Sequence, residues 1–262
     1  MTRLPVVPNR ELGQHFLVDE NILGVIGRLA ELDGEDVVLE IGPGLGILTR
    51  YLADRVRLVH AVELDRALEP HLSAALEGRR NVELVFGDAL RLDLAALEPR
   101  PTKLVANLPY NVATPIVVES LDGLPSIERW CVMVQREVAD RFVAVPGTKA
   151  YGAVSVVVQL VTERVGFHPV ARTVFRPPPN VDSALVALRR RGPLPERYGA
   201  IKRLVEGAFA HRRKTLPNSL ELAGYAERER AAAALEQLGF LAATRAERLT
   251  PADFIALADL LA

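Results

Sequence analysis

Short runs of consecutive apolar residues alternate with stretches of helical periodicity over roughly the first 190 residues of the chain. Ile22, Val25, Ile26 and Leu29 recur at the spacing of one helix face. The apolar runs cover residues 36–41, 58–62, 82–86 and 104–106. Strands that alternate with helices predict an α/β fold with a doubly wound, mostly parallel, Rossmann-like sheet, because parallel neighbours need helical crossovers.

Boundary signals place several further elements. Asp19 suits the cap of the helix that carries Ile22, and Thr114-Pro115 has the cap-then-proline form of a helix start. Residues 151–165 and 181–188 are apolar stretches that we expect to form the last strands, with an antiparallel hairpin as one arrangement.

A different pattern begins after the linker Gly192-Pro193-Leu194-Pro195. Ile201, Leu204, Val205, Ala208 and Phe209 form a helical stripe, and further apolar helical stretches follow near residues 235–241 and 254–261. We therefore predict two domains, residues 1–191 with the sheet and residues 192–262 with helices only.

The first apolar run leads into a glycine-rich turn. Gly42, Gly44 and Gly46 follow it, and a helical pattern begins at Ile47. Glycines let the backbone approach a ligand closely, and a helix start offers free N–H groups. A nicotinamide-binding turn usually reads G-x-G-x-x-G, whereas these glycines fall at every second position after Glu40. This pattern is typical of an S-adenosylmethionine site, with Gly42 and Gly44 as candidate cofactor-binding residues.

Acidic residues follow the next two apolar runs. Glu63 comes about twenty residues after the glycine turn, where a carboxylate binds both ribose hydroxyls of a nucleoside. Asp65 is an alternative for the same role. Asp88 follows the third run through Gly87 and is placed to meet the adenine amine of the cofactor. A single acid at a strand end is ordinary, but acids in this order at successive strand ends favour a cofactor site.

Asn107-Leu108-Pro109-Tyr110 follows the fourth run. The exocyclic amine of adenine is a poor nucleophile because its lone pair is delocalised into the ring, so its methylation requires acceptors that hold the N–H groups. The side-chain oxygen of Asn107 and the main-chain carbonyl of Leu108 can be these acceptors. Pro109 biases Leu108 toward an extended conformation, and Tyr110 offers a flat face on which a base can stack.

Together these motifs resemble the KsgA-type ribosomal RNA adenine dimethyltransferases, and the similarity runs nearly from end to end. Further matching segments are Gly13-Gln14-His15-Phe16-Leu17, Gln135-Arg136-Glu137-Val138, Phe175-Arg176-Pro177-Pro178-Pro179-Asn180-Val181-Asp182-Ser183 and Arg212-Arg213-Lys214-Thr215-Leu216-Pro217-Asn218-Ser219-Leu220. The resemblance implies N6-dimethylation of two adjacent adenosines in the 3′-terminal hairpin of 16S ribosomal RNA, with S-adenosylmethionine as cofactor and a role in small-subunit biogenesis.

The resemblance also implies individual roles. Asn107 would orient the target amine close to the methionine end of the cofactor. His15 and Leu17 would cover the cofactor, which Gly42, Glu63 and Asp88 hold. The family usually has Asn where this chain has His15, which puts an amide contact to the cofactor in doubt. Phe175 would stack on the target base opposite Tyr110.

Charge is concentrated in one segment. Residues 189–216 contain nine Lys and Arg against two acids, which leaves −8 for the rest of a chain whose formal net charge is −1. This asymmetry predicts a phosphate-binding face in the helical domain, with Arg212, Arg213 and Lys214 as RNA-binding residues. The partners that we expect are small-subunit ribosomal RNA and the immature small ribosomal subunit.

Composition narrows the remaining classes. The chain has 262 residues, of which 49% are hydrophobic, so it can bury a large core. Its single cysteine, Cys131, which we expect in the core, rules out an internal disulfide and a cysteine-rich zinc site, and we expect no metal. Residues 1–5 lack the apolar stretch of a signal peptide, so we expect a cytoplasmic chain without a membrane span. Nothing requires more than a monomer.

Three other functions fit parts of the pattern. A macrolide-resistance type dimethyltransferase performs the same chemistry on large-subunit ribosomal RNA, but the Arg212–Leu220 segment and the small C-terminal domain argue against it. A ribosome-assembly factor could act mainly by binding, although the intact catalytic motifs suggest that methylation is kept. A methyltransferase for DNA or a small molecule would not need the basic C-terminal segment.

Overall fold

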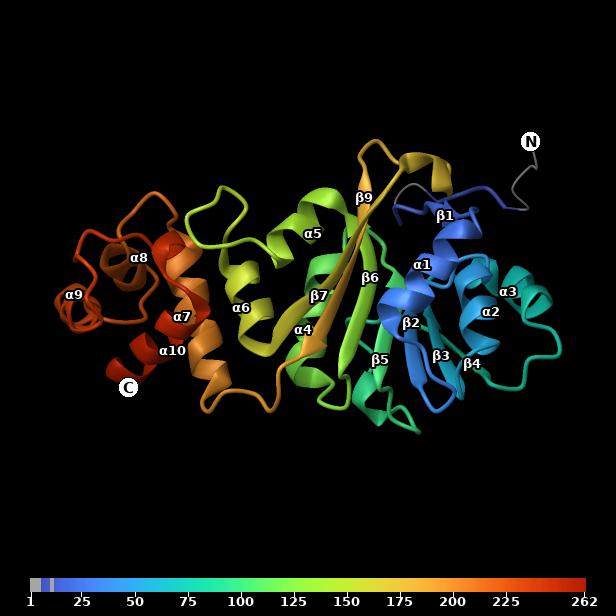
Figure 1. Ribbon diagram of the computed structural model, residues 1–262, viewed down its shortest axis with the longest axis horizontal. Coiled ribbons are helices and arrows are strands. Elements are labelled where there is room, and N and C mark those ends of the chain that lie inside the picture. Colours follow the sequence, from blue (N-terminus) through green and yellow to red (C-terminus); the bar gives the residue numbers. More distant parts are fainter. Residues whose placement is uncertain (1–5, 10–11) are drawn as a thin grey trace. The chain divides into compact units, whose positions relative to one another are not determined.

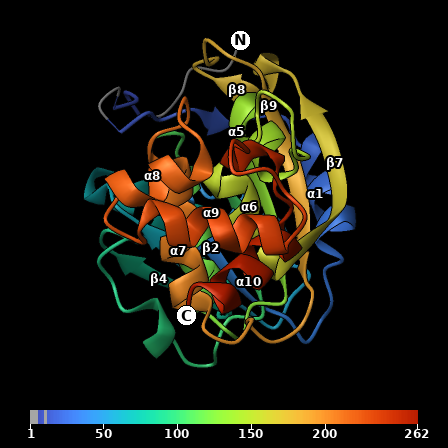
Figure 2. The same ribbon diagram turned by 90° about the vertical axis from the view of Figure 1, so that its left-hand side faces the viewer.

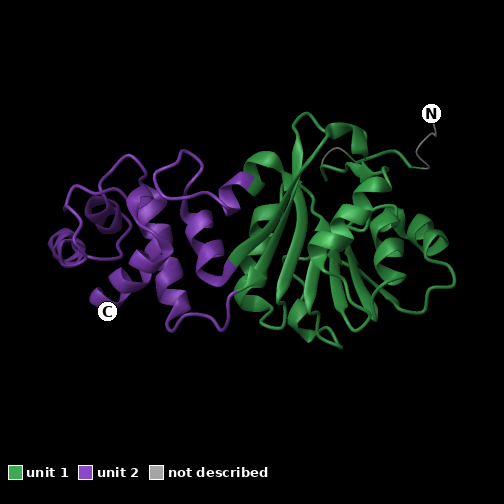
Figure 3. Ribbon diagram, in the orientation of Figure 1, with its two compact units in different colours: residues 1–139, 163–190 green, residues 140–162, 191–262 purple. Residues whose placement is uncertain are grey.

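The computed structural model describes residues 6–9 and 12–262. Residues 1–5, on which the expectation of no signal peptide rests, lie outside the described residues. The chain forms two compact units, coloured separately in Figure 3. Unit 1 comprises residues 1–139 and 163–190, and unit 2 comprises residues 140–162 and 191–262.

Unit 1 is built around a seven-stranded sheet in the order β4-β3-β2-β5-β6-β9-β7 (Figure 1). Its strands are β2 (Val37–Ile41), β3 (Leu58–Glu63), β4 (Val82–Phe86), β5 (Lys103–Asn107), β6 (Arg129–Gln135), β7 (Thr162–Val170) and β9 (Ser183–Arg190). Neighbours from β4 to β6 are parallel, and β9 is antiparallel to β6. The prediction of a mostly parallel α/β sheet is therefore confirmed. A separate two-stranded sheet joins β1 (Phe16–Leu17) to β8 (Phe175–Arg176).

Helices cover both faces of this sheet. The helices of unit 1 are α1 (Asn21–Ala30), α2 (Ile47–Ala53), α3 (Glu69–Ala75), α4 (Ala113–Gly123) and the start of α5 (Arg136–Phe142). On the α1 side, Ile26 and Leu52 share an apolar cluster with Cys131, and burial raises the pKa of the Cys131 thiol to about 12. Side chains alternate along a strand, so Trp130 points to the opposite face, where its indole N–H donates to the Ser120 hydroxyl of α4 at 2.8 Å. The central strands β2, β5 and β6 are mostly buried between these helices, which explains their apolar runs, whereas β4 at the sheet edge is partly exposed.

The two predicted helix starts differ slightly from the observed ones. Asp19 accepts a hydrogen bond from the Asn21 N–H at 2.8 Å, although the cap position of α1 is Glu20. Helix α4 begins at Ala113, and its cap is Val112. The prediction that Thr114 is the cap was therefore wrong. Pro115 lies in the first turn, where a missing N–H leaves no helical hydrogen bond unmade.

The predicted strand over residues 151–165 was wrong for most of its length. Residues Ala153–Val161 form helix α6, and β7 begins at Thr162. Valine favours strands, but burial overrides that preference, and a short apolar run has no period that separates a strand from a buried helix. The Ser155 hydroxyl donates to the Arg141 carbonyl at 2.6 Å and accepts from the Gly152 N–H at 3.1 Å, which stabilises the start of α6. The strand predicted over 181–188 corresponds to β9.

Unit 2 is helical apart from its loops, and its helices are labelled in Figure 2. They are α6, α7 (Tyr198–Ala210), α8 (Leu216–Leu222), α9 (Arg228–Gln237) and α10 (Pro251–Leu260). The C-terminal helices were predicted, and the boundary placed at 191/192 lies beside the passage of the chain from unit 1 to unit 2. Residues 140–162, which the sequence pattern assigned to the first domain, pack with unit 2 instead. Within the described ranges, no helix is both long and apolar enough to cross a membrane.

Candidate active site

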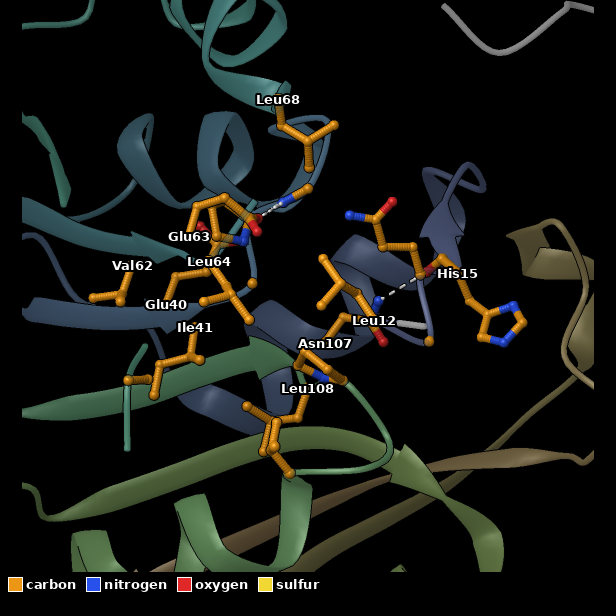
Figure 4. Close-up of a pocket in the computed structure, with 18 of the residues that line it drawn as sticks. Leu12, His15, Glu40, Ile41, Val62, Glu63, Leu64, Leu68, Asn107 and Leu108 are labelled. Atoms are coloured by element: carbon orange, nitrogen blue, oxygen red, sulfur yellow. Dashed lines mark hydrogen bonds between the residues drawn. The ribbon is translucent and has the colours of Figure 1, made fainter. Parts of the chain in front are cut away.

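A cavity lies where β2, β3 and β5 end, at the carboxyl edge of the sheet (Figure 4). The segment of residues 12–17, called the N-terminal strap here, lines it together with the ends of these strands and the loop after β4. Open α/β sheets bind ligands at this edge. Nine residues proposed from the sequence line the cavity: His15, Leu17, Gly42, Gly44, Glu63, Asp88, Asn107, Leu108 and Tyr110.

The glycine turn after β2 has a backbone that other residues rarely adopt. Gly42 and Gly44 have φ angles of 75° and 60°. A Cβ on Gly42 would lie 3.2 Å from Pro109 Cδ, and one on Gly44 would lie 3.0 Å from Phe16 Cδ1. Glycine is therefore needed both for the left-handed turn and for its close approach to neighbouring segments. The turn touches the Asn-Leu-Pro-Tyr segment on one side and the N-terminal strap on the other.

Glu63 ends β3 and is 6% exposed. Its Oε2 accepts from the Gly44 N–H at 3.1 Å, and its Oε1 accepts from the Asp65 N–H at 2.9 Å. Burial raises the pKa of Glu63, and these hydrogen bonds oppose the shift. Each oxygen keeps a further lone pair for a ligand hydroxyl.

Asp65, the alternative to Glu63, has other partners. Its Oδ1 accepts from the Ala67 N–H at 3.0 Å, and its Oδ2 accepts from the Gln14 side-chain amide at 2.8 Å. Asp65 is absent from the cavity lining, whereas Asp88 lines it and is half exposed. Asp88 Oδ1 accepts from the Leu90 N–H at 3.0 Å, and Oδ2 lies 3.4 Å from Arg91 Nε. This arrangement favours Glu63 and Asp88 as the ligand carboxylates.

Asn107 is held in one orientation by the N-terminal strap. Its side-chain amide donates to the His15 main-chain carbonyl at 3.3 Å, as the dashed line in Figure 4 marks. The amide oxygen is then left to accept from a ligand. The Leu108 N–H donates to the Met133 carbonyl at 3.1 Å, which fixes the backbone that follows Asn107.

The His15 side chain points away from the cavity in Figure 4. Its Nδ1 lies 2.8 Å from the Pro177 carbonyl oxygen, and its ring lies 5.5 Å from the Tyr110 ring at an angle of 30°. The part of His15 nearest to Asn107 is therefore its main chain. A contact between the His15 imidazole and a cofactor stays a prediction.

Tyr110 and Phe175 are in different surroundings. The Tyr110 hydroxyl lies 2.6 Å from the hydroxyl of buried Ser183, and burial raises the Tyr110 pKa, so the phenol stays neutral. Phe175 is 2% exposed and packs with Leu17 and Ile22 in the core beneath α1. The structure brings Tyr110 to the cavity but not Phe175, so stacking of Phe175 on a target base stays a prediction.

The basic segment is divided between structural and exposed side chains. Arg190 donates to the Ile127 carbonyl at 2.7 Å, and Arg191 donates to the Thr162 carbonyl at 2.9 Å. In the loop between α7 and α8, Arg212, Arg213 and Lys214 are all exposed, and Arg212 also donates to the Tyr151 carbonyl at 2.8 Å. Some of the cations therefore also have structural contacts, and a phosphate-binding face centred on residues 212–214 stays a prediction. Residues 212–214 belong to unit 2, and the residues that line the cavity belong to unit 1.

The sequence reasoning missed two features of the site. Gln14 joins the N-terminal strap to Asp65, and only its place in the Gly-Gln-His-Phe-Leu segment hinted at a role. Glu40 is 1% exposed inside β2 and lines the cavity. An acid within an apolar strand was a visible signal.

The residues of the cavity suit a ligand with hydroxyl and amine donors. A turn that a Cβ would obstruct lies beside Glu63, and Asp88 and the Asn107 amide oxygen supply further acceptors. S-Adenosylmethionine has a ribose diol, an adenine amine and an α-ammonium group, so the residues present fit this cofactor. Glu63 would hold the ribose, Asp88 the adenine and Gly42 the backbone contact.

Comparisons with known proteins point in one direction. Residues 8–262 match the family model described as ribosomal RNA adenine dimethylase. A protein of Rubrobacter xylanophilus, ribosomal RNA small subunit methyltransferase A, is 50% identical over 250 residues, which cover 95% of this chain and 94% of that protein. The protein of the same name from Ligilactobacillus salivarius is 46% identical and covers 96% of this chain and 89% of its own length.

Two solved structures extend the likeness to the fold. A dimethyladenosine transferase from Plasmodium falciparum superposes with a TM-score of 0.77 at 26% identity, covering 93% of this chain and 96% of that one. The 23S rRNA methyltransferase ErmE superposes with a TM-score of 0.69 at 32% identity, covering 94% and 99%.

Proposed function

This chain belongs to the ribosomal RNA adenine dimethylase family, and from that membership we propose the reaction and the residues that perform it. The protein is an S-adenosylmethionine-dependent adenine dimethyltransferase. Its substrate is small-subunit ribosomal RNA, in which it converts two adjacent adenosines of the 3′-terminal hairpin of 16S RNA to N6-dimethyladenosine. The relatives named as small-subunit methyltransferases support this substrate, at 50% and 46% identity over nearly the whole chain.

The observation that carries the proposed mechanism is the fixed amide of Asn107. Because its N–H group is donated to the His15 carbonyl, its oxygen is available to accept from the target amine. The Leu108 carbonyl is the second acceptor. Together they hold both N–H groups of adenine N6 and draw its lone pair out of the ring, and they stabilise the positive charge that develops on nitrogen.

The cofactor supplies a methyl group activated by a sulfonium centre. Asn107 holds N6 in line with that methyl group, and such positioning accounts for much of the acceleration. No side-chain base is needed, because the nitrogen becomes acidic only after alkylation and water can take its proton. Tyr110, whose hydroxyl is held by Ser183, provides the stacking face for the base.

The large-subunit alternative has one observation in its favour, the superposition on ErmE. Its sequence identity of 32% is well below the 50% of the small-subunit relative. We further propose that Arg212, Arg213 and Lys214 bind RNA phosphates and that the enzyme acts as a monomer on immature small subunits in the cytoplasm.

Methyl transfer to separate subunits tests this function. Labelled S-adenosylmethionine is incubated with unmethylated small subunits and, in parallel, with unmethylated large-subunit RNA, and digested products are identified by mass. We expect N6-dimethyladenosine from the small subunit alone. Label in the large-subunit RNA would favour the resistance-type reaction, and tight binding to small subunits without label in either would favour an assembly factor.

A further inference from the structure

The Tyr110 hydroxyl forms a hydrogen bond with a side chain that is far away in the sequence. It lies 2.6 Å from the hydroxyl of Ser183, the first residue of β9. Ser183 is 1% exposed, whereas Tyr110 is half-buried and lines the cavity. The bond therefore joins the core of the sheet to a side chain of the candidate active site.

The topology of the sheet explains how Ser183 reaches this position. Strand β9 is antiparallel to β6, with Ser183 opposite Gln135, and β6 is parallel to β5, which ends at Asn107 (Figure 1). An antiparallel strand starts at the edge where its parallel neighbours end. Ser183 thus comes to the same edge of the sheet as the turn that carries Tyr110, although the two residues are 73 positions apart.

The Tyr110 ring has a second restraint, which comes from the N-terminal strap. The His15 ring lies 5.5 Å from it at an angle of 30°, a separation that suits offset stacking. His15 Nδ1 in turn lies 2.8 Å from the Pro177 carbonyl oxygen. Tyr110 is therefore restrained both along its ring and at its hydroxyl. A stacking surface that is already fixed loses less conformational freedom when a base binds to it.

The two methyl transfers make different demands on the site. Unmethylated adenine has two N–H groups at N6, one for the Asn107 amide oxygen and one for the Leu108 carbonyl. N6-Methyladenosine keeps a single N–H group, so one of these two acceptors loses its donor. Stacking does not depend on N–H groups. The share of the positioning that Tyr110 must provide is therefore larger in the second transfer than in the first.

We propose that Ser183 is a positioning residue for the second methyl transfer and acts through the Tyr110 hydroxyl. This inference rests on the proposed function. In that transfer N6 of the monomethylated adenosine forms a bond to the methyl carbon, the carbon–sulfur bond breaks with its electron pair left on sulfur, and the last N–H proton passes to water. The products are N6-dimethyladenosine and S-adenosylhomocysteine. Ser183 takes no part in these bond changes but fixes the ring on which the base stacks.

A single-turnover time course with the full-length chain tests this role. Enzyme in excess over unmethylated small subunits is mixed with S-adenosylmethionine, and N6-methyladenosine and N6-dimethyladenosine are measured by mass as they form. Ser183→Ala removes one hydroxyl of the pair, and Tyr110→Phe keeps the ring and removes the other. We expect both variants to accumulate N6-methyladenosine, because the ratio of the first rate constant to the second rises about tenfold.

The double variant shows whether the two hydroxyls act as one pair. We expect it to raise the ratio no further than either single variant, because each substitution already breaks the bond. The matched control is Ser155→Ala, which removes an equally buried hydroxyl in unit 2, away from the residues that line the cavity. It should leave the ratio unchanged, since a smaller fraction of folded enzyme slows both transfers alike.

Three results would overturn the proposal. One is an unchanged ratio in Ser183→Ala. The second is an unchanged ratio in Tyr110→Phe, which counts against the proposal even where Ser183→Ala does not fold. The third is a double variant in which the two single effects multiply, because the hydroxyls would then act independently. Absence of both methylated products with the unaltered protein would instead remove the proposed function.

Discussion

The amide of Asn107 has one hydrogen bond that sets its orientation, and that bond comes from a segment far away in the sequence. Asn107 lies at the end of β5, and its partner is the main-chain carbonyl of His15. A side chain at position 15 is not required for this bond. The departure of this chain from the family at position 15 therefore leaves the orientation of Asn107 intact.

Replacing Asn107 by Ala removes the acceptor for the target amine. We expect kcat to fall by about 100-fold or more, by analogy with the removal of other groups that stabilise developing charge. Binding of small-subunit RNA should change little, because that binding depends on phosphate contacts. Single-turnover methylation measures the first quantity and filter binding the second; methylation at the original rate would remove Asn107 from the mechanism.

At the residue scale, the sequence allowed us to predict which residues line the cavity, but not which hydrogen-bond partners they have. Glu63, Asp88 and Asn107 line one cavity because parallel strands end at one edge of a sheet, while their roles stay predictions. The hydrogen bond from Gln14 to Asp65 could not be predicted, because the two residues are far apart in sequence and meet only in the folded protein. Arg190 was counted with the phosphate-binding cations for the same reason, since its carbonyl partner at Ile127 is distant in sequence.

At the scale of elements, the N-terminal strap is held at several points. Gln14 donates to Asp65 and accepts from the Asn9 N–H at 2.7 Å, and the strand β1 within the strap pairs with β8. The Gln14–Asp65 bond connects the strap to the segment after β3, and the β1–β8 pairing connects it to Phe175 and Arg176. Because the strap lines the cavity, we expect its hydrogen bonds to affect how fast a bound cofactor exchanges.

Gln14→Ala should loosen the strap without altering the cavity floor. Loss of a hydrogen bond to a carboxylate predicts that S-adenosylhomocysteine dissociates about tenfold faster. Amide hydrogen exchange at residues 12–17 should also become faster. Gln237→Ala, in an exposed position of α9, is the matched control. An unchanged dissociation rate together with unchanged exchange would show that the Gln14–Asp65 bond does not hold the strap.

The Ser155 hydroxyl group stabilises the start of helix α6. Ser155→Ala would leave the Arg141 carbonyl and the Gly152 N–H without this partner, and an unsatisfied buried group costs about 2 kcal/mol. We expect the free energy of unfolding to decrease by about that amount in urea titrations. Ser73→Ala, at an exposed position of α3, should have almost no effect. Equal stabilities of the two variants would contradict the assignment.

The type of α6 was beyond prediction from its own residues. Its sequence, Ala-Val-Ser-Val-Val-Val-Gln-Leu-Val, has the composition of a strand. The helix is selected by packing against α7 and α10, which follow much later in the chain. The parallel strands β2 to β5 were predictable from two signals. Each has an apolar run, and each run is followed by a glycine or by a polar residue with a candidate role.

At the scale of the whole molecule, charge and pH provide two independent tests. Of the predicted phosphate-binding triplet, Arg213 and Lys214 are the residues to change first, because Arg212 also donates to the Tyr151 carbonyl and its replacement would disturb that contact. A double variant, Arg213→Glu with Lys214→Glu, should weaken binding to small subunits. It should also lower the slope of log Kd against log salt concentration by about two.

The control for this variant is a charge-matched change elsewhere in unit 2. Arg228→Glu with Arg230→Glu reverses two exposed cations of α9 and should leave the slope nearly unchanged. If both double variants lower the slope equally, the effect reflects net charge and not a site at residues 213–214.

Stability should fall as pH rises through neutrality. The folded protein holds a proton on Glu40 up to about pH 8, whereas the unfolded chain loses it near the ordinary value of 4.5. Between these values the native state binds more protons, so the free energy of unfolding decreases with pH by about 1 kcal/mol per unit from this group. Urea titrations from pH 6 to 8 should show a smaller slope in Glu40→Gln; parallel curves would contradict a protonated Glu40.

The chain passes between its two units more than once, and this affects how the protein can be made and divided. Unit 1 is interrupted by residues 140–162, and its strand β9 ends only at Arg190. During synthesis α6 is therefore made before the last strands of the sheet, β7 and β9, and before its packing partner α7. A fragment that stops at residue 191 would carry the apolar helix α6 without α7 and α10, against which α6 packs, so it is a poor choice for expressing unit 1 alone.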